Sequence, residues 1–212
     1  MSVIGTDYIY RSRITILDIL EGRGYNTKPY RKFSPKEIDA FISNYSSLNM
    51  TLQHSVEDKR HCVVNYLTSR LMKQKIGIFF EDILEKMEVD EEDREFYEGI
   101  FLIQEPITDT HHLAALTEWN NNKRRIAFFY IPQIVLNPLN HVLVPPHTIV
   151  GNDVHEELMK QLNITSKSQL PIIKFHIDPI ARCLGLIPGD IIKIVRPSPS
   201  AGTYTVYRVC TP

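Results

Sequence analysis

The chain has few of the residues that mark secreted or zinc-binding proteins. Its three cysteines, Cys62, Cys183 and Cys210, are far apart and form no C-x-x-C pair. An odd number of separated cysteines argues against a disulfide framework and against a zinc site. We therefore expect the protein to work in a reducing compartment.

Long apolar runs are absent as well. The longest run, residues 126–136, is interrupted by Pro132 and Gln133, and it is shorter than the roughly 20 residues that a membrane-spanning helix needs. The first residues lack a basic start followed by an apolar stretch, so we expect neither a signal peptide nor a membrane partner. The formal net charge of -1 means that any DNA contact must come from a local patch.

Catalytic and ligand-binding motifs are also missing. No Walker loop, G-x-G-x-x-G, G-x-S-x-G elbow or papain-like cysteine motif occurs. His111 and His112 are adjacent on an expected helix and would point about 100° apart, which disfavours a shared metal ion. His54, His61 and Cys62 lack a fourth ligand at a standard spacing. We expect no metal site and no cofactor.

One enzymatic alternative stays open. Residues 57–59 have the E-x-K form of nuclease sites, in which Glu57 would hold Mg²⁺ and Lys59 would stabilise charge. Asp39 would supply the second carboxylate of this metal-dependent nuclease. Because E-x-K is common and the surrounding residues are polar, a solvated charge run is the favoured interpretation.

The first part of the chain alternates between helical and strand patterns. Ile9, Ile16 and Leu20 share a helical face, and Ser34 followed by Pro35 and Glu37 has the form of a helix start. The expected helices cover residues 6–21, 34 onward, 81–87 and 109–119, and the expected strands cover 75–80, 99–103 and 125–130. This order predicts a small mixed sheet flanked by helices.

The last part of the chain has its own starts and stops. Pro145 and Pro146 mark a boundary after residue 143, because each proline fixes φ and removes a backbone donor. Asp153 with Glu156 predicts a capped helix with an apolar stripe of Val154, Leu158 and Leu162.

A second short helix and a hairpin follow. Asp178-Pro179 opens the helix and Gly185 ends it. Residues 190–196 and 203–209 predict two strands of a hairpin joined through residues 200–202.

A long motif runs through this region, in the form H-x-LVP-x-H followed by LP-x-I-x-x-x-DP-x-A-x-x-x-GL-x-x-G-x-x-x-K-I-x-R-x-S-x-x-x-G-x-Y-x-x-YR. The matching residues are His141, Leu143, Val144, Pro145, His147, Leu170, Pro171, Ile173, Asp178, Pro179, Ala181, Gly185, Leu186, Gly189, Lys193, Ile194, Arg196, Ser198, Gly202, Tyr204, Tyr207 and Arg208. In order and spacing the segment resembles the assembly domain of the fifth subunit of eukaryotic RNA polymerases, a family that includes a shorter archaeal form.

The resemblance implies an α/β (α+β) protein of two domains. Residues 1–143 would form a jaw-like domain with a small mixed sheet flanked by helices, and residues 144–212 a compact α+β assembly domain. The protein would be a non-catalytic subunit of a multisubunit DNA-directed RNA polymerase, whose Mg²⁺-binding carboxylates belong to the largest subunit. It would dock on that largest subunit near the omega-like small subunit, and it would not be a homo-oligomer.

The resemblance also implies which residues contact partners. The expected subunit interface comprises His141, Pro145, His147, Pro171, Asp178, Pro179, Arg182, Gly185, Gly189, Lys193, Arg196, Ser198, Gly202, Tyr204, Tyr207 and Arg208. The hairpin cations could bind nucleic acid or pair with carboxylates of a partner subunit, and the resemblance favours the second. Exposed sheet edges could also accept a strand from another chain.

Weak, sequence-independent contacts with downstream duplex DNA are expected from the jaw, within the polymerase only. Two basic groups could supply them, of which the second lies in an Asn-rich loop expected to be exposed. Their members are Lys28, Arg31 and Lys32, and Lys123, Arg124 and Arg125.

The resemblance is patchy before residue 141, and Cys183 and Pro188 depart from the usual family residues. It implies a nuclear location if the protein is cellular, and the host cytoplasm or the virion if a large DNA virus encodes it. A third alternative is a free-standing adaptor that scaffolds transcription factors.

Overall fold

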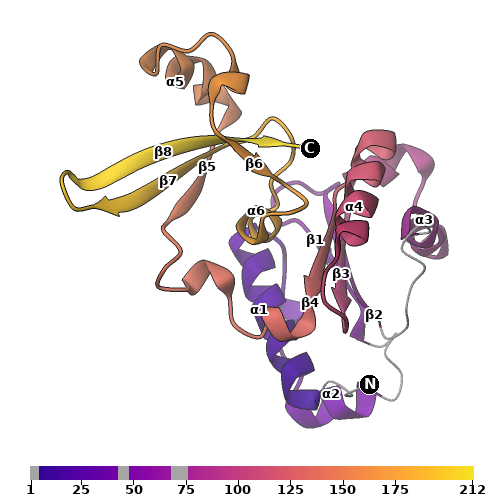
Figure 1. Ribbon diagram of the computed structural model, residues 1–212. Coiled ribbons are helices and arrows are strands. Elements are labelled where there is room, and N and C mark those ends of the chain that lie inside the picture. The colour runs from indigo at the N-terminus through magenta and orange to yellow at the C-terminus, as the bar shows by residue number, and fades with distance from the viewer. Residues whose placement is uncertain (1–4, 43–47, 68–75) are drawn as a thin grey trace. The chain divides into compact units, whose positions relative to one another are not determined.

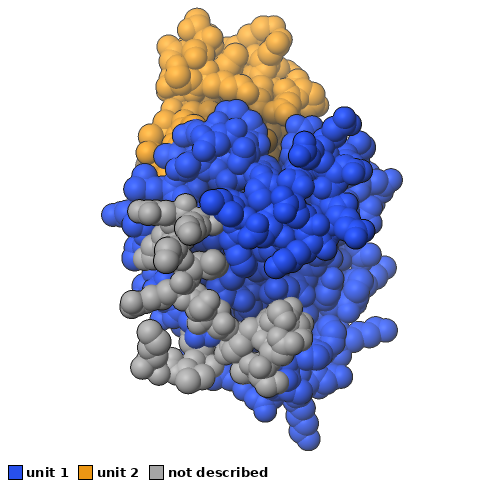
Figure 2. Space-filling model, turned by 90° about the vertical axis from the view of Figure 1, so that its right-hand side faces the viewer, with its two compact units in different colours: residues 1–137 blue, residues 138–212 orange. Residues whose placement is uncertain are grey.

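The structure of the chain is a computed structural model that describes residues 5–42, 48–67 and 76–212 (Figure 1). The chain divides into two compact units, Met1–Asn137 and Pro138–Pro212, which Figure 2 shows in different colours. Each unit has its own mixed sheet with helices, which confirms the α/β (α+β) class. The division after residue 143 into functional domains stays a prediction.

Unit 1, residues 1–137, is built on a sheet with the strand order β1-β2-β3-β4. β1 is antiparallel to β2, whereas β2, β3 and β4 are parallel to one another. The strands are β1 Met50–Gln53, β2 His61–Leu67, β3 Tyr97–Ile103 and β4 Ile126–Tyr130, and the helices are α1 Thr6–Gly22, α2 Pro35–Ile42, α3 Ile76–Lys86 and α4 Asp109–Asn122. The expected helices over 6–21, from 34 onward and over 109–119 and the strands over 99–103 and 125–130 are confirmed. The helix expected over 81–87 is the second part of α3.

Helices cover both faces of this sheet. Figure 1 shows α1 on one side and α3 and α4 on the other. On the α3 side, Phe101 and Phe128 join Phe80 and Leu84 in one buried cluster. Because both faces are covered, β2 to β4 are almost continuously buried, as is usual for parallel strands.

The strand predicted over residues 75–80 is wrong. Residues from Ile76 onward form the first turns of α3, and Lys75 lies outside the described residues. Ile76, Phe80 and Leu84 are buried and spaced four residues apart, which is the period of a helix that packs one face against a sheet. Residues 76–80 are mostly apolar, so the helical spacing of the buried residues could not be recognised within this short run.

Unit 2, residues 138–212, contains a sheet with the strand order β5-β7-β8-β6. The strands are β5 His147–Val150, β6 Ile172–Lys174, β7 Ile191–Ser198 and β8 Gly202–Thr211, and the helices are α5 His155–Gln161 and α6 Pro179–Leu184. β7 and β8 form the predicted antiparallel hairpin. β5 pairs with residues 191–194 only and β6 with residues 209–211 only, so the far half of the hairpin projects beyond its neighbours (Figure 1).

The two helix starts expected in unit 2 have different outcomes. Asp178 caps α6 as predicted, and its side chain accepts hydrogen bonds from the backbone N–H of Ile180 at 2.8 Å and of Ala181 at 3.1 Å. The cap expected at Asp153 is wrong, because a 3₁₀ turn over Asn152–Val154 precedes α5. His155 is buried there, with its Nε2 3.1 Å from the Val150 carbonyl oxygen, and this contact fixes the start of α5.

The apolar stripe expected on that helix is wrong as well. Val154 and Leu162 are exposed, and only Leu158 of the three joins the core, where it packs with Leu170 and Val209. Since His155 takes the first buried position, the helix is rotated away from the face that the sequence suggested.

Candidate subunit interface

Part of the long motif shapes unit 2 itself. Asp178 and Pro179 start α6, and Gly185 ends it in the left-handed conformation, with φ 75°. Gly189, in the turn before β7, and Gly202, the first residue of β8, also have positive φ, at 102° and 71°. These positions favour glycine because a Cβ is strained in that region. Their observed role is intramolecular.

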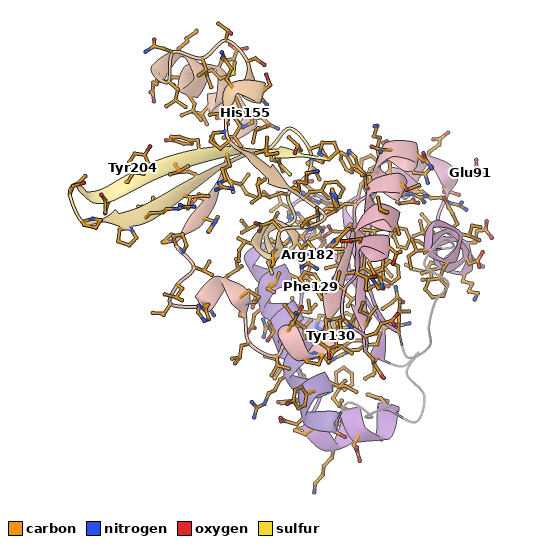
Figure 3. All side chains as sticks on the ribbon, viewed as in Figure 1. Glu91, Phe129, Tyr130, His155, Arg182 and Tyr204 are labelled. Atoms are coloured by element: carbon orange, nitrogen blue, oxygen red, sulfur yellow. The ribbon has the colours of Figure 1, made fainter. Side chains whose placement is uncertain are left out.

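Other motif residues hold the loops around the sheet. His141 Nδ1 accepts a hydrogen bond from the Leu143 backbone, and His147 Nδ1 contacts the Pro145 carbonyl. The Pro171 carbonyl accepts from the Val209 N–H at 2.9 Å. Arg182 on α6 is buried (Figure 3).

The hairpin presents the remaining motif residues on two faces. Directly opposed residues of an antiparallel pair share a face. Arg196 opposes Tyr204, and Arg208 lies four residues further along β8 on the same face. Tyr204 is 61% exposed, and Figure 3 shows its ring pointing away from β8. Tyr207 lies on the opposite face, where it packs against the core cluster of Leu158 and Val209.

No carboxylate neutralises the cations of the hairpin. Residues 191–211 contain no Asp or Glu. Across the described part of the chain, Lys193, Arg196 and Arg208 form no ion pair, and Arg208 donates only to the Ile172 carbonyl, at 3.2 Å. Arg196 is exposed on the projecting half of the hairpin, whereas Lys193 and Arg208 are half-buried at its base, where β7 pairs with β5. The exposed guanidinium group of Arg196 could therefore bind a carboxylate of another chain.

The basic run in unit 1 is arranged differently, and the exposure expected for two of its residues is wrong. Arg124 and Arg125 are 3% and 4% exposed. Arg124 pairs with Glu81 and, at 2.7 Å, with Glu118, because buried guanidinium groups need carboxylate partners. The hydrogen bond that Glu81 accepts from Arg124 lowers the pKa of the Glu81 carboxyl.

Two further arginine side chains, Arg23 and Arg125, are buried around one shared carboxylate. Glu98 at the start of β3 pairs with Arg23, which follows α1, and with Arg125 at 2.9 Å, and it accepts a hydrogen bond from the Tyr25 hydroxyl at 2.8 Å. Burial by itself would raise the pKa of Glu98, but the two guanidinium groups outweigh it and lower the pKa to about 2. The cluster ties α1, β3 and β4 together.

The other expected DNA-proximal residues are on the surface. Arg31 is engaged by Asp18 at 2.8 Å and by Glu21, both on α1. Lys28, Lys32 and Lys123 are exposed and have no ion pair among the described residues. Of the two basic groups, these three lysines keep their charge available to solvent.

The residues of the nuclease alternative do not form a cluster. Asp39 accepts a hydrogen bond from the Thr6 hydroxyl at 2.6 Å, Lys59 pairs with Asp93 at 3.0 Å, and Glu57 lies 3.7 Å from Arg60. Among the described residues, no group of three or more His, Cys, Asp or Glu could hold a metal ion. Over the same residues, no helix is long and apolar enough to cross a membrane.

Comparison with known proteins places this arrangement in a family of polymerase subunits. A family model described as RNA polymerase Rpb5, C-terminal domain, matches residues 136–210. Subunit rpabc1 of DNA-directed RNA polymerases I, II, and III from Dictyostelium discoideum is 32% identical over 206 residues, which cover 93% of this chain and 94% of that protein. Subunit Rpo5 of the DNA-directed RNA polymerase from Thermococcus kodakarensis is 49% identical over 73 residues, which cover 34% of this chain and 87% of the relative.

A third relative matches less of the chain. Subunit RPABC1 from Caenorhabditis elegans is 37% identical over 87 residues, 41% of this chain and 40% of that protein. The Dictyostelium similarity extends over both units. The chain belongs to the family of the fifth subunit of DNA-directed RNA polymerases.

Proposed function

We propose that the chain is a non-catalytic structural subunit of a multisubunit DNA-directed RNA polymerase that docks through its C-terminal assembly domain, residues 144–212. The observation that carries the docking surface is the hairpin, where the exposed Arg196 and the half-buried Lys193 and Arg208 have no carboxylate partner among the described residues. Its partner is the largest polymerase subunit, next to the omega-like small subunit. The membership of the chain in the fifth-subunit family supports this assignment.

Unit 1 has the complementary role in this proposal. It would form the jaw that flanks downstream duplex DNA, with Lys28, Lys32 and Lys123 as weak phosphate contacts. Arg124 and Arg125 are not among these contacts, because their guanidinium groups are buried and paired with Glu81, Glu118 and Glu98. A cellular form would work in the nucleus.

Co-purification tests the proposal. We expect the tagged full-length chain, expressed in its own cells, to be recovered together with two very large polymerase subunits in equal amounts. A protein that is recovered without polymerase subunits would contradict the proposal. Mg²⁺-dependent DNA cleavage by the free chain that is lost in Asp39→Ala would instead support the nuclease alternative.

A further inference from the structure

The two outer edges of the projecting hairpin are not equivalent. The Val209 N–H bonds to the Pro171 carbonyl and the Thr211 carbonyl accepts from the Phe175 N–H, so these residues of β8 turn their backbone groups toward β6. Backbone groups alternate between the two edges of a strand. Thr203, Thr205 and Tyr207 therefore turn theirs to the same edge, beyond the end of β6.

This edge of β8 is open. No backbone hydrogen bond among the described residues uses the outward N–H or C=O of Thr205. Pro171 precedes β6 and has no N–H, so it cannot donate to the Tyr207 carbonyl. The Thr203 N–H is the exception, because it bonds to the Ala201 carbonyl at 2.8 Å within the turn.

The opposite edge of the hairpin, formed by β7, cannot donate backbone hydrogen bonds to an added strand at Val195 and Pro197. By the same alternation, Val195 and Pro197 face outward on β7. The Val195 N–H is already bonded to the Pro146 carbonyl at 3.2 Å, and Pro197 has no N–H. Proline on an edge strand is a common protection against unwanted pairing. One edge of this hairpin is protected and the other is not.

We propose that the open edge of β8, residues 203–207, pairs with an extended segment of the partner polymerase subunit, which adds a strand beside β8 in line with β6. An added strand of about five residues would match the length of this edge. The segment would carry carboxylates toward Arg196 and Arg208, which lie on one face of a hairpin without acidic residues. This strand addition rests on the proposed function, since it names how the proposed docking site binds.

Proline substitution at Thr205 tests the pairing. Thr205→Pro removes the outward N–H but leaves the ladder with β7 in place, because the backbone of Thr205 turns away from β7. Thr205→Val, which keeps the N–H, is the matched control. In the full-length chain, we expect Thr205→Pro to bind the polymerase about tenfold more weakly than Thr205→Val, given the missing hydrogen bond and the clash of the ring.

Hydrogen exchange gives a second measurement that does not depend on a variant. We expect the outward amides of Thr205 and Tyr207 in the wild-type chain to exchange at least about tenfold more slowly in the assembled polymerase than in the free chain. Equal exchange in both states would overturn the strand addition, and so would equal binding of Thr205→Pro and Thr205→Val.

The outcomes separate the strand addition from the function on which it rests. If the wild-type chain does not co-purify with polymerase subunits, the proposed function fails. If the wild-type chain and Thr205→Pro are recovered equally, only the strand addition fails. A free chain that dimerises, with the dimer lost in Thr205→Pro, would assign the edge to a second copy and also overturn the proposal.

Discussion

Arginines of the two units differ in whether they pair with carboxylates of their own unit. In residues 1–137, Arg23, Arg124 and Arg125 are buried against carboxylates of the same unit. In residues 138–212, Arg196 and Arg208 lie on a hairpin that has no acidic residue. The same residue type is therefore paired with carboxylates inside unit 1 and has no carboxylate partner on the hairpin of unit 2 among the described residues.

The difference follows from the environment of each charge. A buried guanidinium group must be paired, since an isolated buried charge costs several kcal/mol. The guanidinium group of Arg196, on the projecting half of the hairpin, is exposed to solvent and needs no partner within the chain. The basic run at residues 123–125 shows that a cluster of cations in sequence does not by itself define a surface patch.

The largest effect is expected from the shared carboxylate of unit 1. Glu98→Gln keeps the shape of the side chain but leaves Arg23 and Arg125 buried without a counter-charge. We expect the free energy of unfolding to fall by about 3–5 kcal/mol in urea denaturation. The matched control is Glu57→Gln, at an exposed ion pair, with an expected change within about 0.5 kcal/mol. A loss below about 1 kcal/mol for Glu98→Gln would contradict the structural role of the cluster.

The pH dependence of the free energy of unfolding tests the same carboxylate, Glu98. The pKa of Glu98 is about 2 in the folded chain, against an ordinary value of 4.5. As the pH falls, Glu98 takes up its proton in the unfolded state before it does so in the folded state. The stability that the Glu98 carboxylate contributes is therefore complete above a pH of 4.5 and is lost as the pH falls toward about 2. We expect the urea midpoint of the wild-type chain to fall more steeply than that of Glu98→Gln in this window. Parallel curves would contradict the assignment.

A smaller effect is expected from a motif residue that shapes unit 2. Asp178→Ala removes the side chain that caps α6, and we expect a loss of about 0.5–2 kcal/mol in the free energy of unfolding. Asp178→Asn, which can still cap, should restore most of it. If Asp178→Ala leaves stability unchanged but abolishes polymerase binding, Asp178 contacts the partner directly.

Much of the fold could be predicted where the signal is local. The Asp178 cap, the Gly185 stop and the strands of the hairpin depend on neighbouring residues, and the sequence indicates each of them. The first part of α3, residues 76–80, was missed, although a helix over 81–87 was expected, because the buried face becomes clear only over the whole spacing from Ile76 to Leu84. β2 was missed because a strand buried on both faces shows no alternation.

The charge clusters could not be predicted, for a different reason. Arg124 pairs with Glu81, which is 43 residues away in the sequence, and Arg125 pairs with Glu98, which is 27 residues away. No local pattern links such partners. The long motif was recognised only through its resemblance to a family, and the structure was required to separate its turn-forming residues from the exposed Arg196.

The smallest effect is expected from the three exposed lysines of unit 1. Lys28→Glu with Lys32→Glu and Lys123→Glu should leave assembly of the polymerase unchanged. The affinity of the polymerase for downstream duplex DNA should become less dependent on salt. The slope of log K against log salt should change by about 0.9 for each phosphate that the lysines of unit 1 no longer neutralise. An unchanged slope would show that none of the three lysines contacts DNA.

The most direct measurement is the amount of the largest polymerase subunit recovered with tagged Arg196→Glu. Arg196 is an exposed hairpin cation, and Lys160→Glu on α5 is a control with the same charge change in the same unit. If Arg196 binds a carboxylate of the partner subunit, Arg196→Glu should lower the recovery of the largest polymerase subunit about tenfold and leave the free chain folded. Lys160→Glu should have no effect on this recovery. Equal recovery with both variants would contradict a docking role for the hairpin charge.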